Sequence, residues 1–339
     1  MARHLPLVLA LMLGCADLGT PSDPGDDLPL GDVAMSDSKA DGPDPQWGWA
    51  LTCKQAPLLT PLAQPRIIVS INGLSLHLID DATGTSRVYP IGVGILDWDT
   101  SSNTYGESLT WGAVVEAGTQ DFTLLPDYVD PCKTWWTDKA TGEKSPVFAG
   151  LPFLNWYGNY GFHGPVDNFT AENGGDLRRG FVSHGCVRMQ AADVLELYAL
   201  TRGVQVPVHV QREPERDAAG VRIDVPDRWI GSECQADADC NFPGGFCHPS
   251  QCSERGFCSA RCTGGCADKD GYPMTFCTVD PDSTHEGMCV PRQTAENGDC
   301  RPYDHMRAER AARFGQSGYV VNACMPETPG WLGWGGCSE

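Results

Sequence analysis

One short segment of the chain carries the residue types that covalent catalysis needs. Ser183-His184-Gly185-Cys186-Val187-Arg188-Met189 places a cysteine after a glycine that allows a tight turn, and Tyr160-Gly161-Phe162-His163-Gly164 supplies a second histidine upstream. A thiol becomes a strong nucleophile when an adjacent base accepts its proton, and nearby backbone N–H groups can stabilise the resulting oxyanion. These residue types therefore favour acyl transfer through Cys186.

Patterns of apolar residues predict the elements that position this segment. Residues 65–80 alternate apolar and polar on both sides of Asn72-Gly73, a strong hairpin signal, and residues 88–96 predict a third strand. Residues 191–200 have apolar side chains at helical spacing, and residues 204–210 return to the strand pattern. We therefore expect Cys186 to lie between the turn at Gly185 and the onset of this helix, whose free N–H groups and dipole would favour the thiolate. The aromatic-rich residues 97–160 are expected to cover one face of the sheet or to border a cleft.

These motifs resemble those of the L,D-transpeptidase (YkuD-type) family. In that family a β-rich catalytic domain carries a His-Gly pair followed by Ser-His-Gly-Cys-x-Arg, and residues 183–188 match the second motif throughout. The resemblance covers roughly residues 65–211. It implies a mainly β fold, an L,D-transpeptidase-like β-sandwich or barrel with a short helix after the catalytic cysteine. It also implies peptidoglycan stem peptides as the substrate and no cofactor.

The resemblance assigns a role to each residue of the two motifs. Cys186 would be the acyl-accepting nucleophile and His163 the general base. Gly185 and Cys186 would lend backbone N–H groups to the oxyanion. Three further residues would shape the site: His184, Ser183 and Tyr160. Two would contact the substrate: Gly164, and Arg188, which would anchor a carboxylate or hold the loop.

Two classes of function remain open on this reading. In the first, the chain is an enzyme that passes an acyl group from Cys186 to an amine, making a 3-3 cross-link or attaching a protein, or to water, acting as an L,D-peptidase. In the second, it is a non-catalytic binding protein of the cell envelope on the same fold. The complete Ser-His-Gly-Cys-x-Arg motif favours the enzyme.

The N-terminus has the features of a bacterial lipoprotein signal. An apolar run too short to span a bilayer leads into Leu11-Met12-Leu13-Gly14-Cys15, which resembles a lipobox, so residues 1–14 would be removed and Cys15 would carry lipid. The alternative is an ordinary secretory signal with an accidental cysteine. Residues 16–46 hold eight Asp and one Lys, so residues 15–46 are expected to be a disordered acidic tether.

The 16 cysteines, 39 glycines and 26 prolines are typical of a loop-rich chain in an oxidising compartment. Setting aside Cys15 for lipid and Cys186 for catalysis leaves fourteen cysteines, an even number. We therefore expect one free thiol, Cys186, and seven disulfides, with Cys53 paired to Cys132 and the twelve C-terminal cysteines paired among themselves.

The cysteine-rich end is expected to be a small separate domain. The catalytic domain would span residues 47–212, a linker residues 213–230, and a disulfide-rich C-terminal domain residues 231–339. No metal site is expected, because the cysteines lack Cys-x-x-Cys spacing and three histidines without ligand spacing should lie on the surface: His248, His285 and His305. The region could bind the cell-wall polymer, with Trp331 and Trp334 stacking on sugars, hold another envelope protein, or cover the catalytic domain.

Charge excludes one class of partner. The 339 residues include 44 acidic and 24 basic side chains, a formal charge of −20, which argues against nucleic acid. A strongly acidic chain should also avoid anionic lipid headgroups, so we expect membrane contact only through the lipid anchor. The expected location is the bacterial cell envelope, facing the periplasm or the cell surface.

Overall fold

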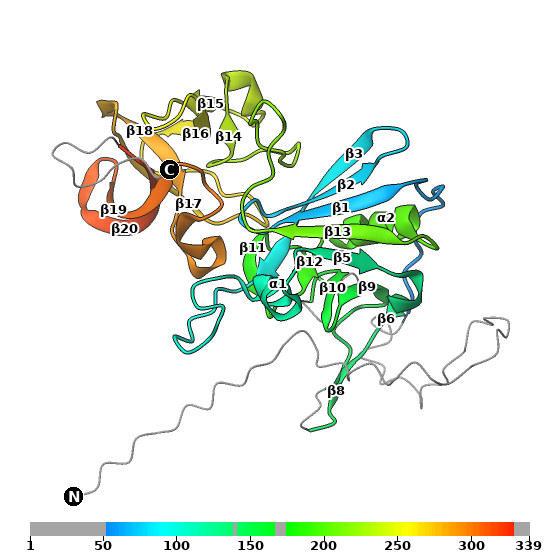
Figure 1. Ribbon diagram of the computed structural model, residues 1–339. Helices are drawn as coiled ribbons and strands as arrows, with labels where there is room; N and C mark the ends of the chain where they lie inside the picture. Colours follow the sequence, from blue (N-terminus) through cyan, green and yellow to red (C-terminus); the bar gives the residue numbers. More distant parts are fainter. Residues whose placement is uncertain (1–51, 138–140, 167–173, 329–339) are drawn as a thin grey trace, which may run out of the picture.

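The computed structural model describes residues 52–137, 141–166 and 174–328. The expected signal segment and tether, the anchor residue Cys15 and the two tryptophans Trp331 and Trp334 lie outside these ranges. Within the ranges, no helix is long and apolar enough to cross a membrane. The elements are mostly strands, which confirms the expected mainly β fold (Figure 1).

The first sheet contains the predicted hairpin. Its strand order is β3-β2-β1-β13-β5, with bounds β1 Pro65–Ser70, β2 Ser75–Asp80, β3 Thr85–Pro90, β5 Asp121–Leu124 and β13 Val206–Gln211. β1 and β2 pair antiparallel with Ile67 opposite Leu78, as the alternation over residues 65–80 predicts. β13 lies parallel to β1 and confirms the strand expected near residues 204–210.

The second sheet carries the reactive motifs. Its order is β11-β4-β12-β10-β9-β6, with bounds β4 Gly92–Gly94, β6 Val129–Lys133, β9 Leu151–Tyr157, β10 Tyr160–His163, β11 Gly180–Ser183 and β12 Val187–Arg188. The single strand predicted over residues 88–96 is wrong, because the chain passes from β3 in the first sheet to β4 in the second. Ile91 at this crossing is fully buried, and a side chain on Gly92 would lie 2.8 Å from the Arg178 carbonyl oxygen. Only glycine permits that approach.

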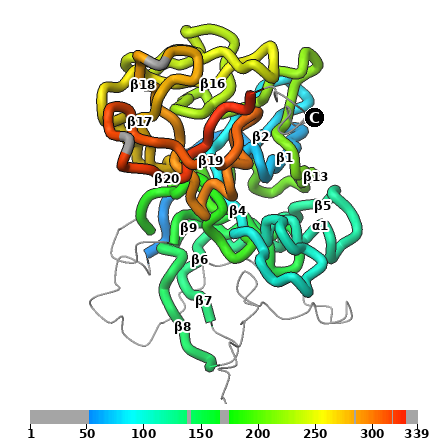
Figure 2. The backbone as a smooth tube through the Cα atoms, turned by 90° about the vertical axis from the view of Figure 1, so that its left-hand side faces the viewer, coloured from blue at the N-terminus to red at the C-terminus, as the bar shows by residue number. Residues whose placement is uncertain are grey.

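Short helices and one hairpin complete this part. Their bounds are α1 Gly112–Ala117, α2 Ala191–Thr201, η2 Leu109–Trp111, η3 Pro126–Tyr128, β7 Trp136–Thr137 and β8 Lys144–Ser145. α2 confirms the predicted helix, and its buried face repeats every three residues at Val194, Leu197 and Leu200. Figures 1 and 2 both show the β7–β8 hairpin projecting away from the body, on the side opposite the C-terminal part.

One apolar core joins both sheets and α2. It includes Ile67 and Val69 of β1, Leu154 of β9 and Leu197 of α2, none more than 1% exposed. Burying such a side chain contributes about 1.5–3 kcal/mol. The predicted disulfide Cys53–Cys132, with Cα atoms 5.1 Å apart, ties the segment before β1 to β6. Closing a loop of 79 residues stabilises the fold by about 4 kcal/mol in the chain-entropy model.

The cysteine-rich part forms a third sheet of order β14-β16-β18-β17-β19-β20, and β15 pairs with β16. Its elements are β14 Glu233–Cys234, η4 Asp237–Asp239, β15 Gly245–His248, β16 Gly256–Cys262, β17 Thr275–Asp280, β18 Ser283–Pro291, η5 Ala295–Cys300, β19 Met306–Arg313 and β20 Gln316–Pro326. Ten of its cysteines pair among themselves, as expected: Cys234–Cys247, Cys240–Cys258, Cys262–Cys277, Cys266–Cys289 and Cys300–Cys324. Their sulfur atoms fill much of its small interior.

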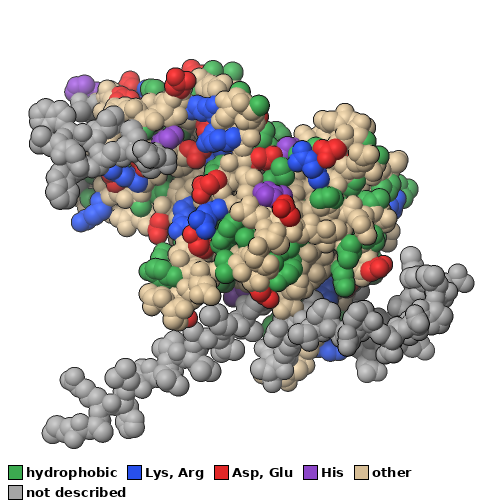
Figure 3. Space-filling view, viewed as in Figure 1, with side chains coloured by type: hydrophobic (Ala, Val, Ile, Leu, Met, Phe, Trp, Pro, Cys, Tyr) green, Lys and Arg blue, Asp and Glu red, His purple; other side chains and the backbone are tan. Residues whose placement is uncertain are grey.

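The segment expected to be a linker is packed into the junction of the two parts. Arg222 donates to the carbonyl oxygens of Gly73 (2.8 Å) and Pro302 (2.6 Å), one on each side of the junction. Asp224 pairs with Arg179 at 2.7 Å. Burial alone would raise the pKa of Asp224, but the Arg179 and Arg222 guanidiniums hold this pKa below its usual value. Basic and acidic side chains are also interspersed on the surface at this junction (Figure 3).

Candidate active site

The chain crosses β4 to place Cys186 between two strands of the second sheet. β11 and β12 lie on opposite sides of β4, so residues 184–186 connect them across its end. Gly185 makes this turn possible, because its φ is +128° and a side chain there would lie 2.9 Å from the Tyr160 ring. Cys186 is 3% exposed at the end of the turn.

Hydrogen bonds hold this nucleophile loop, defined here as Ser183–Cys186. The Ser183 hydroxyl donates to the Cys186 carbonyl oxygen (2.5 Å) and accepts the Gly185 N–H (3.0 Å), which agrees with a shaping role for Ser183. Thr110 donates its hydroxyl to the Gly185 carbonyl oxygen (2.7 Å) and accepts the Gly94 N–H (2.7 Å). The Gly185 N–H is thus engaged by Ser183, and an oxyanion would have to share or displace that bond. Its oxyanion role stays a prediction.

His163 is oriented by its own backbone neighbour. It ends β10, is 5% exposed, and its Nδ1 lies 2.7 Å from the Gly164 carbonyl oxygen. Because a carbonyl only accepts, Nδ1 must carry a proton, so in neutral His163 the basic nitrogen is Nε2. The ring stacks on Phe153 (centroids 5.8 Å apart) and meets the edge of Phe148 (5.3 Å).

The same aromatic pocket holds Cys186. Its side chain packs with Phe148 and Phe153, the two rings that also contact His163. β12 pairs in parallel with β10, with Arg188 opposite His163, which sets the two motifs side by side. The fold therefore brings together the candidate nucleophile and base from segments far apart in sequence.

The remaining predicted site residues differ in their burial and in their neighbours. Tyr160 begins β10 with its ring against Gly185, and burial raises its pKa to about 12, so the phenol stays neutral and acts as a wall. Arg188 is buried on β12, whereas His184 is exposed. Gly164 lies against Leu151, where a side chain would come within 2.2 Å of Cδ1. The binding roles of these residues stay predictions.

The helix expected after Cys186 is α2, and a short strand separates it from the cysteine. α2 begins at Ala191, and Val187–Arg188 between them form the strand β12. These two residues pair with β10, so the backbone after Cys186 is extended rather than helical. α2 therefore does not begin directly at Cys186.

The expected free thiol is also contradicted. The described residues contain no free cysteine, and Cys186 is disulfide-bonded. Its bond is not one of the six that join cysteines within the described ranges. Parity counting failed here because it assumed in advance that Cys186 stays reduced. A disulfide sulfur is not a nucleophile, so the chemistry of this site belongs to the reduced form of Cys186.

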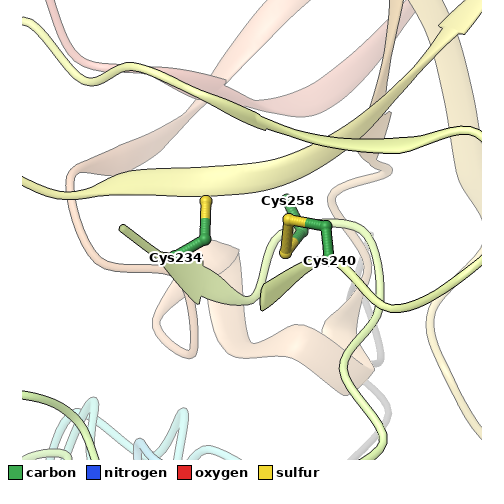
Figure 4. A group of neighbouring side chains, drawn as sticks. All are labelled: Cys234, Cys240 and Cys258. Carbon is green, nitrogen blue, oxygen red and sulfur yellow. A yellow bond between two sulfur atoms is a disulfide. The ribbon is translucent and has the colours of Figure 1, made fainter. Parts of the chain in front are cut away.

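One group of cysteines with metal-ligand proximity is occupied by disulfides. Figure 4 shows Cys234, Cys240 and Cys258, whose sulfur atoms lie within 4.8 Å of one another, with Cys240 and Cys258 joined. Cys234 is bonded to Cys247, so these sulfurs offer no thiolate to a metal. His248, expected on the surface, is 2% exposed and contacts Asp280 at 3.0 Å. The prediction considered only the spacing between histidines and therefore missed the buried contact of His248 with Asp280.

Three site residues were not identified from sequence motifs. Thr110, Phe148 and Phe153 come from the aromatic-rich stretch 97–160, which was expected only to cover the sheet or border a cleft. The hydroxyl of Thr110 had no sequence signal, since its partners Gly94 and Gly185 lie 16 and 75 residues away.

The fold and the site define a β-rich domain with a buried cysteine beside an oriented histidine. Residues 64–210 match the family model described as YkuD, the L,D-transpeptidase catalytic domain, and this range includes both motifs. Among solved structures, L,D-transpeptidase (Yku) from Stackebrandtia nassauensis is similar at 15% identity, covering 48% of this chain and 60% of that chain, with a TM-score of 0.27. No curated protein sequence matches this chain. The chain thus combines a YkuD-type region with a disulfide-bonded, cysteine-rich C-terminal part.

Proposed function

We propose that the reduced protein is a cysteine acyltransferase that acts on peptidoglycan stem peptides. The observation that carries this proposal is the Nδ1 bond of His163 to Gly164, which directs the proton to Nδ1 and makes Nε2 basic in the pocket of Cys186. The match of residues 64–210 to the L,D-transpeptidase catalytic domain supports the substrate class.

The first half-reaction would form a thioester. His163 Nε2 accepts the thiol proton while the Cys186 sulfur attacks an amide carbon of the stem peptide. The tetrahedral intermediate then collapses, the C–N bond breaks, and His163 returns the proton to the departing amine. Backbone N–H groups of the nucleophile loop would stabilise the oxyanion.

The second half-reaction decides the product. An acceptor amine attacks the thioester, His163 takes its proton, the C–S bond breaks, and the thiol is restored. The result is a 3-3 cross-link or an attached protein; water in place of the amine would give an L,D-peptidase. Which product forms depends on whether an acceptor amine or water reaches the thioester.

Carbapenem labelling tests the nucleophile. After mild reduction, the wild-type chain should gain the mass of one carbapenem, and Cys186→Ala and Cys186→Ser should gain none. The untreated chain should label poorly, since its Cys186 sulfur is in a disulfide. Stoichiometric labelling of the Ala variant would refute Cys186 as the acyl acceptor.

Defined muropeptides test the reaction. Incubation with the reduced protein should yield cross-linked dimers by mass, and trimmed monomers alone would identify a peptidase. If the enzyme neither labels nor turns over muropeptides, the non-catalytic envelope-binding role takes the place of this proposal.

A further inference from the structure

The cysteine-rich part contacts the catalytic part at the strand that leads into the nucleophile. η5 lies against β11, and the two backbones meet through two glycines. A side chain on Gly180 of β11 would lie 2.3 Å from the Glu296 carbonyl oxygen, and one on Gly298 of η5 would lie 2.8 Å from the Phe181 ring. Such close fitting leaves little freedom for β11 to shift relative to η5.

Polar contacts also hold β11 in its position relative to the cysteine-rich part. Arg178, just before β11, pairs with the Glu296 carboxylate at 2.8 Å. The next residue, Arg179, donates its backbone N–H to the carbonyl oxygen of Gly271 (2.9 Å), another residue of the cysteine-rich part. The segment that leads into Ser183 is therefore held in place by residues of the cysteine-rich part, which lies outside the YkuD-type region.

Arg301, the residue that follows η5, contacts residues 106–107, which lead into the second support of the nucleophile loop, Thr110. Arg301 donates to the Gly106 carbonyl oxygen and lies 3.7 Å from the Glu107 carboxylate. This segment leads directly into Ser108, which donates to the Gly94 carbonyl oxygen (2.7 Å), and Thr110, which holds Gly185 (2.7 Å). Residues 296–301 thus contact both supports of the loop, β11 on one side and residues 106–110 on the other.

The contacting segment is itself rigid. Cys300 is bonded to Cys324 of β20, and the Asn297 side chain, fully buried, donates to the Arg292 carbonyl oxygen (2.6 Å) and accepts from the Thr294 N–H (3.0 Å). A rigid segment can transmit position to the strands it touches, whereas a mobile one cannot.

We propose that residues 296–301 of the cysteine-rich part position the nucleophile loop, with Arg301 as a positioning residue for Cys186. This inference rests on the proposed acyl transfer. Arg301 and η5 set the separation between β11 and residues 106–110, and that separation determines whether Ser183 and Thr110 can hold Cys186 against His163. The cysteine-rich part is then a component of the catalytic unit rather than an independent binding module.

The test compares acylation of reduced, full-length variants by a carbapenem. Arg301→Ala should lower the maximal acylation rate constant roughly tenfold or more, because a small misplacement of a reacting atom is costly, and leave the half-saturating carbapenem concentration near the wild-type value. Arg301→Lys, which can still donate to Gly106, should recover part of the rate. Arg310→Ala, an exposed arginine on β19 of the same part, is the matched control and should behave as wild type.

Melting temperatures separate positioning from folding. Slow acylation by Arg301→Ala at a temperature well below its own melting transition supports the inference. If that variant does not fold, Glu296→Gln, which weakens only the exposed pair with Arg178, should still slow acylation measurably. Wild-type rates in every folded variant would overturn the inference. Failure of the reduced wild-type chain to acylate would instead refute the proposed function.

Discussion

At the scale of the residue, the orientation of His163 determines which proton transfers the site can perform. The Gly164 carbonyl oxygen fixes the proton on Nδ1, and the stacked Phe153 ring fixes the plane of the imidazole. A base that is already oriented loses little freedom in the transition state. This orientation supports the proposal that His163, rather than the exposed His184, is the general base.

Replacing His163 tests that assignment. His163→Ala should slow acylation of the reduced protein by about 10²-fold or more, the usual contribution of a positioned base, as measured by the rate of carbapenem adduct formation. His209→Ala is the matched control, because His209 is only partly buried on β13 and pairs with Asp121 at 2.8 Å, outside the pocket. An unchanged rate in the His163 variant would transfer the base role to His184.

At the scale of the element, the nucleophile loop depends on one buried hydroxyl from a neighbouring segment. Thr110 is fully buried and bridges Gly94 to Gly185 with two bonds of 2.7 Å. Valine has nearly the same shape but cannot make either bond, so it would leave a donor and an acceptor of the backbone unsatisfied.

Thr110→Val should therefore lower the free energy of unfolding by about 1–3 kcal/mol and slow acylation. Urea titration of the reduced protein and carbapenem labelling measure the two effects. Thr110→Ser keeps the hydroxyl and should retain most of the activity. A valine variant with wild-type unfolding and acylation would show that the loop holds its shape without Thr110.

At the scale of the whole molecule, the junction joins the two parts into one unit. Arg179, Arg222 and Asp224 are buried there, and removing one member of such a set leaves an uncompensated charge. The segment between the two parts is therefore packed rather than extended into solvent. The C-terminal part covers one end of the catalytic part, and the β7–β8 hairpin lies at the other end (Figure 2).

Attachment to the cell envelope is a separate proposal that rests on the sequence around Cys15. If Cys15 carries lipid, Cys15→Ser should move the protein from the membrane fraction to the soluble fraction, because acyl chains then no longer insert into the bilayer. Fractionation followed by immunoblotting measures this, and Ser22→Ala in the same segment should stay in the membrane fraction. Membrane association that survives Cys15→Ser would refute lipid attachment at this residue.

Local patterns in the sequence were sufficient for several elements. The hairpin at residues 65–80, the helix beginning at Ala191 and β13 follow from alternation and helical spacing, which depend on near neighbours alone. The Cys53–Cys132 bond followed from the positions of these two cysteines, which both lie in the expected catalytic domain while twelve others cluster near the C-terminus. Cys186 as nucleophile and His163 as base were predicted from motif residues and a family resemblance, and both roles stay predictions.

Contacts between distant segments decided the rest. Val187–Arg188 form a strand that local patterns did not predict, because β10 lies beside them, and residues 88–96 divide because the chain changes sheets at Ile91. Thr110, Phe148 and the contacts of Arg301 join residues whose separation leaves no periodic signal. Each of these features is set by proximity in space, which only the tertiary structure determines.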